Sequence, residues 1–386
     1  MSSSRYDHII TGMGCAGLSL AVQMSVAGLT KGRRILLIDR EQKNQNNRTW
    51  SFWEVEPGPF EEIVYRQWKQ AWFHSSEFSS LLDLPPYSYK MIRGLDFFHH
   101  CLDIIGKDPA FEIRYQHVDA IGNRDGMAYC EAEGNVYTSD YLFNSILFEK
   151  PAMAKGEYYL LQHFKGWVVE TEEPGFKTGQ ATLMDFRPSQ EHGTTFVYVM
   201  PFSEKKALIE YTLFSEKILH EDDYTKGLKA YIDNILGLRN WKIIEEEFGI
   251  IPMTNHRFTR RDGRILNIGT AGGRTKASTG YTFRFIQKDT ADIIALMQQS
   301  GSPFTGRYGY SRFDWYDSVL LNILSHRTLE GARIFHDLFK NNSPQTILKF
   351  LDNETTVKDE LGILSSLPQL PFMKAGISEI FKKISS

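Results

Sequence analysis

The N-terminal part of the chain contains two short apolar runs separated by a stretch of helical character. Residues 6–11 and 34–39 are runs of strand length, typical of buried parallel strands. Residues 18–27 between them have the length and composition of a helix. The chain is therefore predicted to begin with a β-α-β unit.

Glycines occupy the turn between the first strand and this helix. Gly12, Gly14 and Gly17 have the spacing G-x-G-x-x-G, and Asp39 ends the second apolar run about 20 residues later. In dinucleotide-binding units these glycines allow the tight turn, the approach of a pyrophosphate and close helix packing. Free N–H groups at the helix start, around Ala16, face the phosphates, and Asp39 would accept hydrogen bonds from a ribose. The pattern predicts a bound dinucleotide; the alternative is a glycine-rich turn without a ligand.

Residues 40–148 contain several short segments with different hydrophobic patterns. Residues 40–60 show no clear period and are interpreted as a loop crossing the cofactor region, while 87–94 alternate and 95–105 have helical spacing. Short strand candidates follow at 111–115, 126–131, 136–138 and 141–148. These segments are expected to return to the first sheet.

Residues 155–215 are rich in alternating, strand-like runs. The candidates are 167–170, 181–186, 194–201 and 206–214, and the pattern favours an antiparallel sheet with one covered face. A helix is predicted at 221–236, then a strand at 265–268 leads into a second glycine cluster, Gly269, Gly272 and Gly273. Helices are predicted at 283–298, 315–325 and 329–339.

The glycine motif alone fits FAD or NAD; its position at residue 12 resembles that in many FAD proteins, so FAD is the expected cofactor. The predicted fold class is mixed α/β: a Rossmann-like FAD-binding domain, an inserted antiparallel β-sheet substrate domain and a helical C-terminal region. The expected boundaries, in chain order, are 1–80 (FAD-binding, first part), 81–105 (connecting segment), 106–150 (FAD-binding, return strands), 151–255 (β-rich substrate domain), 256–300 (FAD-binding, second glycine cluster) and 301–386 (helical region). Ligand sites are common at such domain junctions.

Composition excludes several classes of protein. A 42% hydrophobic and 24% charged content is ordinary for a soluble globular protein, and a net charge of -3 gives no reason to expect nucleic acid as a partner. The three cysteines form no CxxC pair, so neither a disulfide framework nor a metal site is expected. No apolar run reaches the roughly 18 residues of a transmembrane helix. We expect a cytoplasmic protein, or one held at a membrane surface.

The C-terminal segment offers one means of reaching a membrane. Ile377, Ile380, Phe381 and Ile384 recur at helical spacing with lysines nearby, a pattern that can lie in the membrane interface. The alternative is a terminal helix that packs on its own domain.

Several segments together resemble lycopene β-cyclases of the bacterial carotenoid pathway. They are distributed over nearly the whole chain and are more specific in combination than the glycine motif. These segments are residues 47–53 (NRTWSFW), 87–94 (YSYKMIRG), 161–167 (LQHFKGW), 183–187 (LMDFR), 200–203 (MPFS), 207–212 (ALIEYT), 269–273 (GTAGG) and 279–283 (TGYTF).

The resemblance implies an FAD-dependent enzyme that converts membrane-dissolved lycopene into β-carotene via γ-carotene, closing a ring at each end. The reduced flavin, with NAD(P)H as electron donor, is required but undergoes no net oxidation. An FAD-dependent redox enzyme acting on an apolar substrate, such as a hydroxylase or isoprenoid reductase, remains the alternative. A third possibility is a lipid-binding protein that has lost its cofactor.

Glu210 is the candidate catalytic acid. Ring closure needs a carboxylic acid that stays protonated, and an apolar site provides this by raising the pKa. Glu210 lies in a strand-like run and matches the family's catalytic glutamate in the Ile-Glu-x-Thr context; the alternative is a solvated strand residue. The resulting cation needs negative charge or aromatic faces. Trp50, Phe52, Trp53 and Tyr211 are the aromatic candidates.

Weaker candidates surround these residues. Arg93 follows a strand-like run where related flavoproteins place an arginine near FAD, and Asp185 is expected to pair with Arg187 or to orient the site. Glu54 is a candidate for holding flavin or substrate, although a solvated loop position is favoured. Many flavoproteins carry Gly-Asp where this chain has Gly269-Thr270. The hydroxyl of Thr270 replaces one hydrogen bond of that acid but not its charge.

Overall fold

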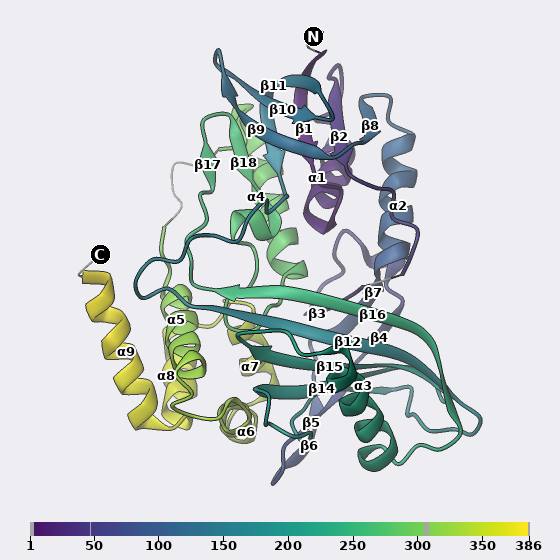
Figure 1. Cartoon of the computed structure of the whole chain (residues 1–386), viewed down its shortest axis with the longest axis vertical. Helices are drawn as coiled ribbons and strands as arrows, with labels where there is room; N and C mark the ends of the chain where they lie inside the picture. The colour runs from purple at the N-terminus through teal and green to yellow at the C-terminus, as the bar shows by residue number, and fades with distance from the viewer. Residues whose placement is uncertain (1–3, 47, 305–308, 385–386) are drawn as a thin grey trace.

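A computed structural model describes residues 4–46, 48–304 and 309–384. Figure 1 shows a first sheet at the N-terminal end of the molecule, a second, longer sheet below it, and C-terminal helices along one side. Together these parts confirm the predicted mixed α/β class with an inserted β-rich body.

The first sheet has a parallel core. β1 pairs with β2 and β11, β2 pairs with β8, and β11 pairs with β18, all in parallel. Its described strands are β1 (Ser4–Thr11), β2 (Ile35–Asp39), β8 (Phe111–Tyr115), β9 (Val118–Arg124), β10 (Met127–Ala132), β11 (Asn135–Asn144), β17 (Arg261–Asp262) and β18 (Ile265–Asn267). One face packs on the helices α1 (Cys15–Val26), α2 (Gly94–Gly106) and α4 (Phe283–Ser300). The antiparallel pair β9 and β10 covers the other face.

The second sheet has the order β16-β12-β15-β14-β13-β5-β6. Its strands are β5 (Gln70–His74), β6 (Ser79–Asp83), β12 (Tyr159–Thr171), β13 (Gln180–Asp185), β14 (Thr194–Ser203), β15 (Lys206–Ser215) and β16 (Trp241–Thr254). Neighbouring strands are antiparallel except β13 and β5. The helix α3 (Glu221–Ala230) and the π-helical turn η2 (Tyr231–Ile235) cover one face.

The opposite face of this sheet packs on the C-terminal helices. These helices are α5 (Arg312–Ser325), α6 (Gly331–Asn341), α7 (Pro344–Leu351), α8 (Val357–Ser366) and α9 (Gln369–Ile384). None of the helices in the described ranges is long and apolar enough to cross a membrane. In Figure 1, α9 (yellow) lies at the outer edge of the molecule.

A small sheet joins the two bodies. It consists of β3 (Thr49–Glu54), β7 (Ser88–Arg93) and β4 (Arg66–Trp68), in the order β3-β7-β4, with the 3-10 turn η1 (Glu61–Ile63) between β3 and β4. The 40–60 region is thus not only a loop, because residues 49–54 pair antiparallel with β7. Pairing with β7 fixes the aromatic residues of this segment in a strand, although the segment itself shows no strand-like alternation.

Two other sequence expectations differ from the structure. β5 and β6 fall in or beside the 1–80 segment that we expected in the nucleotide domain, yet they extend the second sheet through β13. β16 was not predicted as a strand, because its first half carries mostly polar side chains. Both differences arise from long-range strand pairing, which leaves little trace in local composition.

Candidate active site

A cavity of about 330 Å³ lies where the first sheet meets the second. Its wall combines the glycine turn at Gly14, the Gly269 cluster, the β3 aromatic segment and the face of the second sheet that carries Glu210. The cavity therefore brings together the predicted cofactor turn and the predicted catalytic acid, which are far apart in sequence.

The glycine turn has the geometry that its spacing predicts. Gly12 has φ +87°, a left-handed conformation that favours glycine. A Cβ on Gly17 would lie 2.0 Å from the carbonyl oxygen of Gly12, so only glycine allows α1 to pack this closely. A Cβ on Gly14 would meet no atom within 4 Å. The turn is thus tightly packed on its protein side and open on the side that lines the cavity.

The N-terminus of α1 and Asp39 complete this cradle. Among the residues that the structure describes, no side chain caps α1, so the first N–H groups around Ala16 can bind an anion such as a phosphate. Asp39 Oδ2 accepts a hydrogen bond from Met13 N at 2.6 Å, and Oδ1 lies 3.4 Å from Lys43 Nζ. The carboxylate of Asp39 is therefore fixed beside the glycine turn at the end of β2. These features fit a dinucleotide.

The second glycine cluster packs against the first. Residues 269–272 form a 3-10 turn that is continued by Gly273 in a left-handed conformation (φ +71°). A Cβ on Gly269 would lie 2.7 Å from Ala16 Cβ, and one on Gly272 would lie 2.2 Å from Asn267 O. Thr270 lines the cavity beside Gly269. The cluster brings the chain back to the cofactor turn, as the sequence predicts.

Glu210 lies on β15 and is 7% exposed. Its carboxyl accepts a hydrogen bond from Thr212 Oγ1 at 3.1 Å and lines the cavity. Burial raises the pKa of Glu210 well above its ordinary value, and the nearby carboxyl of Glu247 raises it further. Its surroundings therefore favour the protonated form of the Glu210 carboxyl.

Three tyrosines surround Glu210 on the cavity side. Tyr198 is directly opposite Glu210 on β14, and its Oη lies 3.4 Å from that of Tyr281. Tyr89 is 1% exposed, and its hydroxyl is buried without a hydrogen-bond partner among the described residues. Burial raises the pKa of all three phenols, so they remain neutral.

Sequence reasoning missed Glu247, which lies on β16. Its Oε2 accepts a hydrogen bond from Thr49 Oγ1 at 2.9 Å, and its carboxyl lies within hydrogen-bonding reach of Glu210. Glu247 follows Glu245 and Glu246 in a polar run, and such a run is normally solvated. No local pattern singles out Glu247 from its two acidic neighbours.

The structure separates the aromatic candidates. Trp50 lines the cavity, with its ring centroid 4.9 Å from that of Phe97. Phe52 and Trp53 lie behind the wall, where Phe52 stacks on Phe283 at 4.4 Å and Trp53 contacts Tyr281 edge-on at 4.7 Å. Tyr281 and Phe283 themselves line the cavity. Phe52 and Trp53 therefore support the rings that face the cavity.

Tyr211 and Asp185 lie away from the cavity. Tyr211 follows Glu210 on β15 and points to the opposite face of the sheet, where its ring packs on Gly227 of α3. Asp185 is fully buried, pairs with Arg187 at 2.5 Å and accepts a hydrogen bond from the Tyr231 hydroxyl at 2.8 Å. Because side chains alternate along β15, Tyr211 does not face the cavity that Glu210 lines. Asp185 does not face it either, because its carboxylate binds Arg187 and Tyr231.

Arg93 is also placed outside the cavity wall. It ends β7 and makes two hydrogen bonds to Asp96, at 2.7 and 3.0 Å. Its guanidinium lies over the Tyr65 ring, 4.2 Å from the centroid. These contacts join β7 to the first turn of α2.

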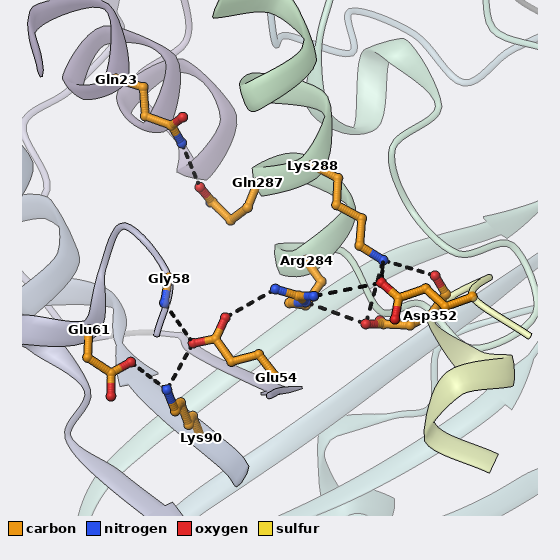
Figure 2. Close-up of polar contacts among 10 residues, drawn as sticks. Gln23, Glu54, Gly58, Glu61, Lys90, Arg284, Gln287, Lys288 and Asp352 are labelled. Carbon is orange, nitrogen blue, oxygen red and sulfur yellow. Dashed lines mark hydrogen bonds and ion pairs between the residues drawn. The ribbon is translucent and has the colours of Figure 1, made fainter. Parts of the chain in front are cut away.

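Glu54 belongs to a charged network behind the aromatic wall, shown in Figure 2. It is 4% exposed, and its oxygens lie 3.0 Å from Lys90 Nζ and 3.1 Å from Arg284 Nη1. Arg284 and Lys288 in turn contact Asp352 after α7. Glu54 is therefore not a solvated loop residue, because these ion pairs hold β3, β7 and α4 together.

The fold is similar to that of solved flavoproteins. The structure is similar to a flavoprotein/dehydrogenase from Cytophaga hutchinsonii, with TM-score 0.63, 10% identity and coverage of 98% of this chain and 100% of that one. It is also similar to a geranylgeranyl bacteriochlorophyll reductase-like protein from Thermoplasma acidophilum, with TM-score 0.59, 13% identity and coverage of 97% and 96%. At these identities the likeness establishes the fold.

The chain belongs to the lycopene cyclase protein family, whose model matches residues 7–376. A chloroplastic neoxanthin synthase of Solanum lycopersicum is 24% identical over 94% of this chain and 77% of its own length. A lycopene beta cyclase of Narcissus pseudonarcissus is 32% identical over 49% of this chain and 42% of its own length. These findings confirm the resemblance seen in the sequence and place the protein among enzymes of carotenoid biosynthesis.

Proposed function

We propose that this protein is a lycopene β-cyclase that converts lycopene into β-carotene via γ-carotene, with reduced FAD bound and no net redox change. The observation that carries the proposal is a buried glutamate, Glu210, in a cavity that also reaches the glycine turn; its burial raises the pKa of the carboxyl and favours the protonated form. Family membership supplies the substrate class.

The reaction that fits this site begins with proton transfer. The Glu210 O–H adds its proton to the terminal alkene, a neighbouring double bond attacks the tertiary cation, and a proton is then lost to leave the ring. An alkene is a weak base, so the acid must be held in position against it. Thr212 and the row of strand neighbours hold the Glu210 carboxyl in place.

Aromatic side chains would stabilise the cation and exclude water. Trp50, Tyr281 and Phe283 line the cavity, and each ring face contributes about 0.5–2 kcal/mol to a cation placed over it. Exclusion of water matters because water would trap the cation as an alcohol.

We propose that FAD is held by the turn from Gly12 to Gly17, the N-terminus of α1, Asp39 and the cluster at 269–273. The open side of Gly14 and the uncapped helix support this placement. When bound in reduced form, FAD supplies negative charge that favours a developing cation, and NAD(P)H is proposed as its electron donor.

The experiment is an anaerobic assay with purified protein, FAD, reductant and lycopene in liposomes. We expect β-carotene to form without stoichiometric consumption of reductant. Glu210→Gln should lower the rate about 10²–10⁴-fold, the range for removal of a general acid. Glu246→Gln is the matched control, because Glu246 is half-exposed on the same sheet and pairs with Lys165 at 3.3 Å.

Other outcomes would contradict the proposal. Consumption of one NAD(P)H per product would indicate a redox flavoenzyme instead. A protein that cannot be reconstituted with FAD would indicate a lipid-binding role. Normal turnover by Glu210→Gln would remove the assigned acid.

We also propose that the protein binds membranes peripherally through α8 and α9. One face of α9 packs on the domain, where Glu379 Oε1 accepts hydrogen bonds from Tyr158 and Asn322. The other face leaves large apolar side chains exposed, and α8 adds more beside it. These exposed residues are Val357, Leu361, Leu370, Met373, Ile377, Ile380 and Phe381. The side chains of Lys383 and Ile384, which were part of the expected pattern, lie outside the described residues.

Because α9 is also packed internally, substitution is a sharper test than truncation. The double variant Ile377→Asp/Phe381→Asp should lose co-sedimentation with liposomes while keeping the same unfolding midpoint. Val26→Asp, at an exposed apolar position on α1, is the control. Unchanged liposome binding by the double variant would refute this role of α9.

A further inference from the structure

Four adjacent strands place one residue each in a single row across the second sheet. The row runs from Glu247 on β16 through Gly166 on β12 and Glu210 on β15 to Tyr198 on β14. Residues directly opposite one another project from the same face of a sheet. The side chains of Glu247 and Glu210 thus rise on either side of a position that has no side chain.

Gly166 creates the space in which the two carboxyls meet. Neighbouring strands are about 4.8 Å apart, so β15 and β16 are separated by about 10 Å. A Cβ on Gly166 would lie 2.8 Å from Glu247 Cγ and 3.1 Å from Leu208 Cδ1. The side chain of Glu247 therefore lies over Gly166, and this brings its carboxyl within hydrogen-bonding reach of Glu210.

The oxygens of Glu247 have unequal surroundings. Oε2 receives the Thr49 hydroxyl at 2.9 Å. Oε1 is fully buried, and no N–H or hydroxyl of the described residues donates to it. A proton on the Glu210 carboxyl supplies the missing donor.

The surrounding charges decide which carboxyl keeps the proton. Burial raises the pKa of Glu247 above its ordinary value, and Glu245 adds to this rise. The Thr49 hydroxyl, the Glu210 carboxyl and Arg48 act against it and favour the charged form of Glu247. Around Glu210 the facing groups are Thr212 and the neutral phenols of Tyr89, Tyr198 and Tyr281. Two carboxylates this close in a buried site do not both ionise near neutral pH.

We propose that Glu247 is a positioning residue: its carboxylate accepts the Glu210 O–H across Gly166, so that the pair holds one proton and that proton lies on the cavity side. This inference rests on the proposed cyclisation. The O–H bond of Glu210 breaks as the new C–H bond forms, and the proton released by the ring cation restores the pair to one proton. The proton transfer and its return need no electrons and no further reactant.

The first test is an infrared titration of the purified protein, which needs no substrate. The carbonyl stretch of a protonated carboxylic acid separates from that of a carboxylate. We expect the wild-type protein to keep a protonated carboxyl at a pH where ordinary carboxyl groups are ionised, and we expect that signal to be missing in Glu210→Gln. In Glu247→Gln the repulsion is gone, so the apparent pKa of Glu210 should fall by about one unit or more, which is at least tenfold in the acid constant. Glu246→Gln should titrate like the wild type.

The second test is the pH profile of cyclisation. Glu247→Gln should lose activity on the alkaline side about one pH unit earlier than the wild type, because Glu210 then loses its proton more readily. A purely structural role would lower the rate by the same factor at every pH. Glu247→Asp, which keeps the charge, should restore part of the alkaline activity.

These readouts separate the two proposals. An unshifted infrared titration in Glu247→Gln, with cyclisation intact, would overturn the role of Glu247 alone. A shifted titration in a protein that does not cyclise lycopene would overturn the proposed function and leave the shared proton standing. If Glu247→Gln does not fold, the wild-type and Glu210→Gln spectra decide. A wild-type protein with no protonated carboxyl above the ordinary carboxyl pKa range would refute the shared proton.

Discussion

Replacing Gly166 by alanine should separate the two buried carboxyls without disrupting the sheet. The added Cβ would lie 2.8 Å from Glu247 Cγ, whereas carbon atoms in contact prefer about 3.5–4.0 Å. The close atom belongs to a flexible side chain, so Glu247 can rotate away while β12 keeps its pairing. The predicted consequence is a displaced Glu247 carboxyl.

The energetic cost follows from the contacts that Glu247 would lose. Its hydrogen bond from Thr49 at 2.9 Å involves a charged acceptor, and a bond of this kind contributes about 1.5–3 kcal/mol. The contact with Glu210 would be lost as well. We therefore expect Gly166→Ala to lower the free energy of unfolding by about 1–3 kcal/mol, less than a core cavity would.

Three measurements check this prediction. Denaturant unfolding gives the change in stability, infrared titration gives the apparent pKa of Glu210, and the lycopene assay gives the rate. Gly179→Ala is the control, because a Cβ there would meet no atom within 4 Å. An unchanged Glu210 titration in a folded Gly166→Ala protein would refute the claim that this glycine brings the carboxyls together.

Three further predictions concern the cofactor turn and the core. Gly14→Ala adds a methyl group to open space, so unfolding should be unchanged while FAD affinity, measured by flavin fluorescence, falls about tenfold or more; undiminished affinity would argue against the proposed pyrophosphate position. Lys276 Nζ lies 2.6 Å from Asp317 Oδ1, so Lys276→Met leaves Asp317 as an unpaired buried charge. The free energy of unfolding, measured with denaturant, should fall by about 3–5 kcal/mol. A smaller fall would mean that the ion pair is solvated. Trp53→Phe removes the 3.1 Å hydrogen bond from Nε1 to Leu348 O and should cost about 1–3 kcal/mol in the same assay, whereas a neutral result would mean that water replaces the donor.

The nucleotide half of the site could be predicted because its features are local. Gly12 and Gly17 are required by one turn, Gly14 leaves the cavity side of that turn open, and Asp39 ends the very next strand. Local reasoning could also have excluded Tyr211 from the cavity wall. Side chains alternate along a strand, so Tyr211 and Glu210 project from different faces of the sheet. Trp50 and its neighbours were recognised as aromatic, but which rings face the cavity depends on β7 and α4.

The sequence by itself determined the β-α-β unit and the glycine turn, and through its resemblance it indicated the family and the candidate acid Glu210. These properties depend on short-range geometry or on motifs that survive without the fold. The tertiary structure alone decided that β5 and β6 join the second sheet and that Glu54 is an internal ion-pair partner. It also decided that Glu247 meets Glu210 over Gly166. The physical reason is that strand register is set by pairing between distant segments, and the pKa of a carboxyl by what that pairing buries beside it.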